Sequence, residues 1–416
     1  MKQFRHILVG SLIDGSGGPA RQGVIMTLGR GRIVSIVEAS VDDVKPGAVE
    51  DLRSFTVLPG FVDAHVHLAI SGTENAEDRK AQRKASFEEA AFAVEAHLSR
   101  HIRHGVVAVR DGGDKNGYAL LYKKRFLEGR SVPVAVKAAG QAWHAPGRYG
   151  SLIGTTPQTG ENLEEAITRS AMKSDHVKIV NSGLNSLSRF GDDTAPQFSL
   201  DELENAVKKA HALGRKVMIH ANGRVPVGIA VEAGCDSIEH GFFMGRENLE
   251  KMARMGTIWV PTACTMAAYV KTLPKNSREA EVARRNLDHQ LEQIRTARTL
   301  GVQIAAGTDS GSLGVHHGRG LLRELRLLMT AGFRLEEAVK CASGLGAALL
   351  GVESHTGTLA PGRPATFVVV RAAPASLLQN LDDPDLIVVK GKEVQGGKGG
   401  REGFTGTSRT DLLSVP

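Results

Sequence analysis

The chain has 416 residues, 41% of them hydrophobic, which is enough for one large α/β barrel with an additional domain. Its net charge of +7 comes from lysines and arginines that are scattered along the sequence, and only 5% of the residues are aromatic. This composition argues against a nucleic-acid-binding surface, and no apolar run approaches the roughly 20 residues that span a membrane.

The first 57 residues are predicted to be β-rich. Short runs of Val, Ile and Leu are separated by glycines there, as in HILVGSLIDG, GVIMTLGRG and GRIVSIVEAS. A similar texture returns near the end of the chain, in PATFVVVRA and LIVVKGKEV. Residues 396–416 are rich in Gly, Ser, Thr and charge, so they are predicted to be a flexible tail.

Between these β-rich ends, residues 58–355 alternate short apolar runs with helical patterns. One predicted helix covers residues 199–214, where Ser199 can cap the N-terminus and Glu202 supplies the capping-box acid. A second covers residues 278–301. Eight strands that alternate with helices predict a parallel sheet, and eight is the number that closes a barrel. The predicted strands are FVDAHVHL (61–68), GVVAVRDGG (105–113), VAVKAAG (134–140), HVKIVNSG (176–183), KVMIHA (216–221), DSIEHG (236–241), TIWVPT (257–262) and VQIAAGTDS (302–310).

Residues that can bind a metal gather late in these apolar runs, where a barrel of this kind carries its chemistry. His65 and His67 are two residues apart on the first predicted strand, so their side chains point to the same face. His220 ends the fifth run, His240 ends the sixth and Asp309 ends the eighth. Four imidazoles and a carboxylate on one rim are a zinc-like set of ligands. The simpler interpretations are histidines that line a polar barrel mouth and an aspartate that caps the next segment.

Lys178 is unusual because it lies inside the apolar strand HVKIV. Desolvating an ammonium group is costly, so a buried lysine is rare. A neutral lysine can add carbon dioxide and become a carbamate, an anion whose two oxygens can bridge two metal ions. Alternatively, the amine reaches a carboxylate or the water at the rim. The residue alone does not distinguish these two interpretations.

Taken together, LPGFVDAHVHL, HVKIV, MIHANG, SIEHG and AGTDSG resemble the amidohydrolase superfamily in its binuclear form. The order and spacing match over nearly the whole chain, up to HTGTLAPGRPATFVVV, which resembles the return of these enzymes to a small β-sandwich. VRDGG and QFSLDEL resemble the prolidase-like and imidazolonepropionase-related branch. The resemblance implies a (β/α)8 TIM-like barrel over residues 58–355 and a β-sandwich domain built from residues 1–57 and 356–395.

The resemblance also implies a metal centre and a reaction. It places two divalent ions, expected to be zinc, at the barrel mouth, with a carbon dioxide-derived carbamate as their bridge. The more buried ion would have the ligands His65, His67 and Asp309, the other ion His220 and His240, and the bridge would be Lys178. A metal-bridging hydroxide would attack the carbonyl of an amide, peptide-like or N-acyl C–N bond. Asp309 would pass the proton of the hydroxide to the leaving nitrogen.

Three further residues are predicted to contact the substrate. His144, in the loop after the third strand, would also be catalytic by stabilising the developing oxyanion, unless it is an exposed loop histidine. Asn222 stands where dipeptidases of this branch commonly have a tyrosine that helps hold the substrate, so specificity for peptides is open. Arg224 could bind a substrate carboxylate or could be a surface arginine.

Other functions compete with this prediction. Urea, carbamate and cyclic-amide substrates are alternatives for the same centre. A mononuclear deaminase on this barrel typically lacks the strand-four lysine and carries an acid after the strand-five histidine, whereas this chain has Lys178 and no acid in residues 221–225. A non-catalytic metal-binding scaffold would not need the full set of ligands. We expect a small-molecule substrate, and a homo-oligomer is compatible with the resemblance.

Two features predict a cytoplasmic location. The basic N-terminus is not followed by the apolar core and cleavage site of a secretory signal. The three cysteines, Cys235, Cys264 and Cys341, are far apart and fit no disulfide framework, so we expect reduced thiols.

Overall fold

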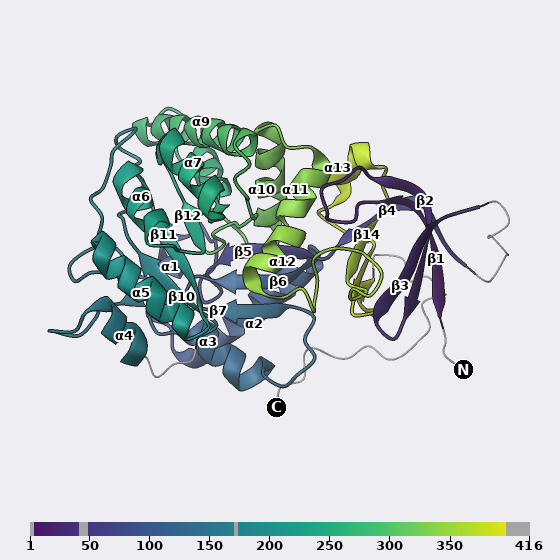
Figure 1. Ribbon diagram of the computed structural model, residues 1–416, viewed down its shortest axis with the longest axis horizontal. Helices are drawn as coiled ribbons and strands as arrows, with labels where there is room; N and C mark the ends of the chain where they lie inside the picture. Colours follow the sequence, from purple (N-terminus) through teal and green to yellow (C-terminus); the bar gives the residue numbers. More distant parts are fainter. Residues whose placement is uncertain (1–3, 41–48, 170–173, 397–416) are drawn as a thin grey trace.

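The structure, a computed structural model, describes residues 4–40, 49–169 and 174–396. The two ends of the chain meet in one seven-stranded sheet at the right of Figure 1, with the order β16-β15-β14-β4-β1-β2-β3. Its strands are β1 (Arg5–Leu12), β2 (Arg21–Gly29), β3 (Arg32–Glu38), β4 (Glu50–Pro59), β14 (Phe367–Val370), β15 (Leu386–Val389) and β16 (Lys392–Gly396). The β structure predicted near both ends is confirmed, and the predicted tail from residue 397 onward lies outside the described residues.

The sheet forms because its strands place apolar side chains on a common face. Ile7 and Val9 of β1, Val24 and Met26 of β2, and Phe367 of β14 are all fully buried in one cluster. Residues two apart on a strand share a face, so each pair contributes to the same apolar layer. β4 is parallel to β1 and antiparallel to β14, and it therefore joins the first part of the chain to the last.

β4 continues almost directly into β5 (Phe61–Val66), with only Gly60 between them. The Gly60 amide donates to the Thr366 carbonyl at 3.2 Å, and its carbonyl accepts from the Thr356 hydroxyl at 2.7 Å. A Cβ at this position would lie 2.5 Å from Cγ2 of Val107, so only glycine fits. The strand that leads to His65 is thus fixed on the seven-stranded sheet.

The central part of the chain forms two parallel sheets. One has the order β5-β6-β7, and the other has the order β13-β12-β11-β10-β8-β9. Their remaining strands are β6 (Val106–Asp111), β7 (Ala135–Ala138), β8 (Ala142–Trp143), β9 (Gly154–Thr155), β10 (His176–Val180), β11 (Lys216–Ala221), β12 (Ser237–His240) and β13 (Ile258–Val260). Each of the first seven predicted runs contains one of these strands, whereas β8 and β9 were not predicted.

The eighth predicted strand, residues 302–310, forms only isolated bridges. Ile304 pairs with Trp259 of β13, and Ser310 pairs with Val66 of β5, both in parallel orientation. Asp309, near the end of this segment, has a φ of 58°, in the left-handed region, so the extended backbone ends there. This segment nevertheless joins the two parallel sheets along one edge.

Helices surround the parallel sheets, as Figure 1 shows. They are α1 (Ala76–Gln82), α2 (Phe87–Arg103), α3 (Tyr118–Tyr122), α4 (Leu163–Arg169), α5 (Leu200–Ala212), α6 (Arg224–Glu232), α7 (Gly245–Met255), α8 (Cys264–Thr272), α9 (Arg278–Thr299), α10 (Arg319–Thr330), α11 (Leu335–Cys341) and α12 (Gly344–Leu350), with α13 (Leu377–Asn380) beside the seven-stranded sheet. α5 and α9 confirm the two predicted helices. Ser199 and Glu202 form the predicted capping box at α5.

Strand β10 explains why Lys178 is held inside the protein. Val177 and Ile179 pack in the main apolar cluster together with Leu203 and Val207 of α5. Because the strand alternates, Lys178 must point to the opposite face, where it is 1% exposed. The apolar neighbours of Lys178 therefore determine the direction of its ammonium group.

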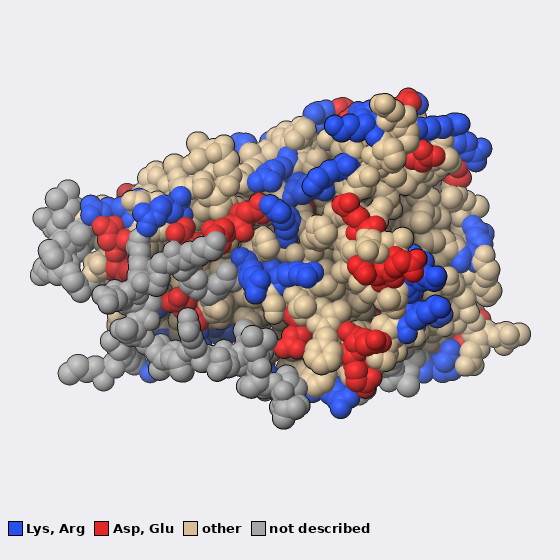
Figure 2. All heavy atoms as spheres, turned by 180° about the vertical axis from the view of Figure 1, so that it is seen from behind, with Lys and Arg blue, Asp and Glu red and all other residues tan. Residues whose placement is uncertain are grey.

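Three features of the structure concern surface charge, membrane spanning and the cysteines. On the face that Figure 2 shows, lysine and arginine side chains are interspersed with aspartate and glutamate side chains. Within the described ranges, the helices are too short or too polar to cross a bilayer. Cys235, Cys264 and Cys341 are buried and form no disulfide.

Replacing Ser199 with alanine should destabilise the protein by about 1 kcal/mol, because the first turn of α5 loses its side-chain acceptor. Chemical denaturation of the two proteins measures this difference in the free energy of unfolding. Ser199→Asp, which keeps an acceptor at the same position, should remain close to the parent. Equal losses in both variants would contradict the capping explanation.

Candidate metal centre

His65, His67 and Asp309 form a compact group at the end of β5. Oδ1 of Asp309 lies 3.2 Å from Nε2 of His67 and 3.5 Å from Nε2 of His65. Their ligand atoms are all within 4.8 Å of one another, and no other such group of three occurs in the part of the chain that the structure describes. The structure therefore brings together the three residues that were predicted to hold the more buried metal.

The other three predicted ligands adjoin this group. The ring centroids of His65 and His240 are 5.0 Å apart, and those of His240 and His220 are 4.6 Å apart. Nδ1 of His240 is hydrogen-bonded to the Thr262 hydroxyl at 2.7 Å, and Nε2 of His220 donates to the Gly183 carbonyl at 3.0 Å. These hydrogen bonds do not use Nε2 of His240 or Nδ1 of His220, so each ring has a second nitrogen that can bind another partner.

The tautomers of His65 and His67 follow from their partners. Nδ1 of His65 donates to Oε2 of Glu239 at 2.7 Å, and Nδ1 of His67 donates to the Gly113 carbonyl at 2.7 Å. A carboxylate and a carbonyl can only accept, so each Nε2 presents its lone pair to Asp309 and the space between the rings. This is the arrangement in which a histidine binds a metal, with its second nitrogen fixed by an outer partner.

Glu239 and Arg110 were not predicted, yet they support the centre from behind. Oε1 of Glu239 accepts from Nη2 of Arg110 at 2.8 Å and from the Ser237 hydroxyl at 2.6 Å. Burial by itself raises the pKa of Glu239, but Arg110 and His65 outweigh it and hold this pKa well below its usual range. The sequence signal was a pair of opposite charges, an arginine in VVAVRD and a glutamate in SIEHG, each inside an apolar strand.

Two nitrogens at the centre, Nε2 of His65 and Nζ of Lys178, are buried and have no hydrogen-bond partner among the residues that the structure describes. An unsatisfied buried polar group costs about 1–3 kcal/mol, so such atoms need an explanation. A Cβ at Gly112 would lie 2.9 Å from Cε1 of His67 and 3.3 Å from Nε2 of His65. A side chain at this position would therefore crowd the two imidazole rings, and glycine avoids this. The orphaned nitrogens and the donor set fit a divalent metal.

Burial controls the charges of these groups. It lowers the pKa of Lys178 to about 8. Burial, with the positive charge of Lys178, lowers the pKa of His65 to about 4 and that of His220 to about 3. The pKa of Asp309 is lowered despite its burial, because His67 and His65 favour the carboxylate. Burial by itself lowers the pKa of His67, but its contact with Asp309 outweighs burial and raises this pKa above its usual value. At neutral pH, neutral His65 and His220 rings and an ionised Asp309 carboxylate are therefore in their metal-binding forms.

The backbone is strained where these strands end. His240, Thr262 and Asp309 have φ values of 68°, 49° and 58°, which only glycine adopts without cost. Such positions typically cost of order 1–3 kcal/mol each and cluster at functional sites. The strained residues thus lie at the same end of the parallel strands as the histidines.

The Amidohydrolase family matches residues 56–394 of the chain. The protein belongs to this family. A solved Xaa-Pro dipeptidase with bound methionine is 26% identical, with a TM-score of 0.79 over 95% of this chain and 100% of the other. Ochratoxinase of Aspergillus niger is 23% identical over 94% of this chain and 87% of its own length. Imidazolonepropionase of Acinetobacter baumannii (strain ACICU) is 26% identical over 83% of this chain and 87% of its own length.

These relatives confirm the predicted resemblance, including the prolidase-like branch. They also confirm that the protein is a hydrolase of carbon–nitrogen bonds. Members of the family generally use a divalent metal, and the His65–His67–Asp309 group provides ligands for one.

The predicted substrate residues of this amidohydrolase lie in different surroundings. His144 is 5% exposed, and its Nδ1 donates to the Ala145 carbonyl at 3.0 Å. The Asn222 side chain accepts from the Phe242 amide at 3.0 Å, and its Nδ2 lies 3.3 Å from the Gly183 carbonyl. Arg224 is exposed at the start of α6. Their contacts with a substrate stay predictions.

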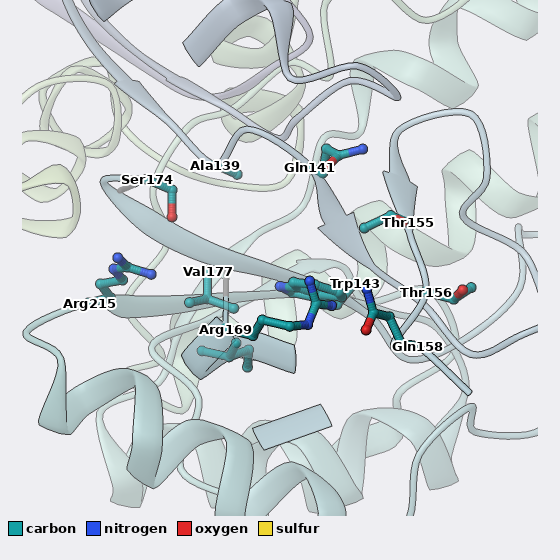
Figure 3. Close-up of a pocket in the computed structure, with 11 residues that line it drawn as sticks. Ala139, Gln141, Trp143, Thr155, Thr156, Gln158, Arg169, Ser174, Val177 and Arg215 are labelled. Atoms are coloured by element: carbon teal, nitrogen blue, oxygen red, sulfur yellow. The ribbon is translucent and has the colours of Figure 1, made fainter. Parts of the chain in front are cut away.

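A cavity of about 260 Å³ lies away from these residues (Figure 3). Val177, which points away from the Lys178 face, lines it together with Trp143, and Arg169 of α4 borders it. It contains none of the predicted site residues. This cavity is therefore on the outer side of the parallel sheet and is separate from the candidate metal centre.

Replacing Glu239 with glutamine should weaken metal binding by about 10- to 100-fold, because His65 loses its charged outer partner. Competition with a chelator, followed by metal analysis, measures the change in affinity. Glu247→Gln is the matched control, since that side chain is 85% exposed on α7. An unchanged affinity in Glu239→Gln would remove Glu239 from the support of the metal.

Proposed function

We propose that this amidohydrolase cleaves an amide, peptide-like or N-acyl C–N bond with water activated between two divalent metal ions, zinc being the expected metal. The proposed ligands are His65, His67, Asp309, His220, His240 and a carbamate on Lys178. The observation that carries the proposal is the buried Nζ of Lys178, which has no hydrogen-bond partner in a cluster of imidazoles. A carbamate would replace this orphaned amine with two oxygen ligands between the rings.

The metal ions, when bound, would lower the pKa of a water molecule and polarise the scissile carbonyl. Asp309 supplies the proton transfer. Its Oδ1 faces His65 and His67, and its Oδ2 accepts from the Ser312 hydroxyl at 2.7 Å, which fixes the orientation of the carboxylate. Asp309 takes a proton from the attacking water and delivers it to the leaving nitrogen.

His144 is proposed to stabilise the oxyanion that develops on the substrate carbonyl. Because its Nδ1 donates to the Ala145 carbonyl, Nε2 is the atom left for the substrate. That nitrogen can donate only when the ring is the imidazolium form. His144 would therefore meet the oxyanion through Nε2.

The relatives support a proposal for the substrate class. The names Xaa-Pro dipeptidase and ochratoxinase favour an amide substrate, and Arg224 is the proposed contact for a carboxylate next to the scissile bond. The match to an imidazolonepropionase keeps a cyclic amide as the second candidate. A mononuclear deaminase is disfavoured by Lys178, which that group typically lacks.

We also propose that residues 58–355 form a closed eight-stranded barrel. The bridges from Ile304 and Ser310 support closure along one edge of the two parallel sheets. Residues 1–57 and 356–395 would form the separate small β domain.

The proposal is tested by reconstituting the protein with zinc and bicarbonate and assaying N-acyl amino acids, dipeptides, cyclic amides and ureas. Two bound metal ions and turnover of at least one amide are expected. Absence of bound metal after reconstitution would contradict the proposed function.

Replacing Lys178 with alanine should abolish the bridge, so metal content and activity should both fall. Small carboxylic acids added at millimolar concentration should partly restore them, because a carboxylate presents the same two oxygens as a carbamate. Metal analysis and turnover, with and without added acetate, measure this. A Lys178→Ala enzyme that keeps two metals and full activity would exclude the carbamate.

Replacing Asp309 with asparagine removes a proton acceptor while keeping the size of the side chain. Turnover should fall by about 10²- to 10⁴-fold, with part of the metal retained. Near-normal kcat in this variant would exclude Asp309 from the proton transfer. Ser312→Ala, which loses only the hydrogen bond to Oδ2, should show a much smaller loss.

A further inference from the structure

Tyr149 is a residue of the centre that neither the sequence motifs nor the proposed mechanism uses. It lies in the loop between β8 and β9, and its ring centroid is 5.4 Å from that of His220. It is close enough to Asp309 for the charge of that carboxylate to act on the phenol. The tyrosine thus lies near both His220, a proposed metal ligand, and Asp309, the proposed proton acceptor.

The loop that carries Tyr149 is held firmly. Nε2 of Gln197 donates to the Tyr149 carbonyl at 2.8 Å, and Oε1 of Gln197 accepts from the Ala145 amide at 2.9 Å. Gly150 has a φ of 140°, and a Cβ there would lie 2.5 Å from Cβ of His144. These contacts fix the backbone that carries the Tyr149 ring before a substrate binds.

The Tyr149 hydroxyl has no assigned structural task. It is not among the buried polar atoms that lack a partner, and among the described residues no side chain or backbone group is hydrogen-bonded to it. A phenol is protonated at neutral pH and can donate one hydrogen bond. The hydroxyl is therefore a free donor on a ring that lies beside His220.

Asn222 follows His220 by two residues and contacts the backbone beside it. Its Oδ1 accepts from the Phe242 amide at 3.0 Å, while its Nδ2 lies 3.3 Å from the Gly183 carbonyl and 3.5 Å from Nε2 of His220. Asn222 therefore helps to fix the backbone around His220, whereas the Tyr149 hydroxyl has no such contact.

We propose that Tyr149 is a catalytic residue that donates its hydroxyl hydrogen bond to the oxyanion developing on the scissile carbonyl, on the His220 side of the centre. This inference rests on the proposed function. It gives the oxyanion two donors from one loop, Tyr149 and His144.

The test begins with Tyr149→Phe, which keeps the ring against His220 and removes only the hydroxyl. Because a lost oxyanion donor typically costs 10²- to 10³-fold in kcat, we expect a fall of about 10²-fold, with little change in KM and two metals retained. Tyr118→Phe on α3 is the matched control and should keep the parent kcat.

Binding of a phosphonate analogue of the substrate is the second measurement. Tyr149→Phe should weaken binding of the analogue about as much as it lowers kcat/KM, because the proposed hydrogen bond is made in the transition state.

The outcomes separate the two proposals. A parent enzyme that holds two metals but hydrolyses no substrate removes the proposed function. An active parent whose Tyr149→Phe variant keeps its kcat overturns the role of Tyr149 alone. A variant that loses metal together with activity also overturns it, because the hydroxyl would then serve the structure of the centre. A Tyr149→Phe variant that binds the phosphonate analogue as tightly as the parent overturns it as well.

Discussion

The buried carboxylate of Glu239 is the interaction on which the rest of the centre depends. It links β12 of one parallel sheet to His65 on β5 and Arg110 on β6 of the other, with distances of 2.7 and 2.8 Å. Nε of Arg110 also donates to the Ala64 carbonyl at 2.7 Å, directly before His65. An isolated buried charge would be costly, but this one is compensated by a cation and a hydroxyl. The same contacts therefore hold the two sheets together and direct the lone pair of a proposed ligand.

Much of the centre could be predicted because its signals are local. A spacing of two places His65 and His67 on one face, and the ends of parallel strands bring His220, His240 and Asp309 to one rim. Glu239 was missed because its importance depends on Arg110, more than a hundred residues away in the chain. Tyr149 was missed for a similar reason: the direction of a loop side chain is set by Gln197 and Gly150, which the sequence does not connect.

The fold differs from the prediction where function constrains the backbone. The segment 302–310 was expected to be a full strand, but Asp309 turns into the left-handed region and leaves only bridges. β8 and β9 were not expected, since two-residue strands carry no periodic pattern. Both differences lie near the proposed substrate space, where side-chain direction outweighs the regular hydrogen bonding of a sheet.

The short connection at Gly60 has a consequence for the order in which the protein is made. β4, which leads directly into the strand of His65, pairs with β14, whose residues Phe367–Val370 follow the predicted barrel in the sequence. During translation, β4 therefore lacks one of its neighbouring strands until β14 has been synthesised. A ribosome-bound chain of this amidohydrolase would carry its histidines before it had the finished support for them.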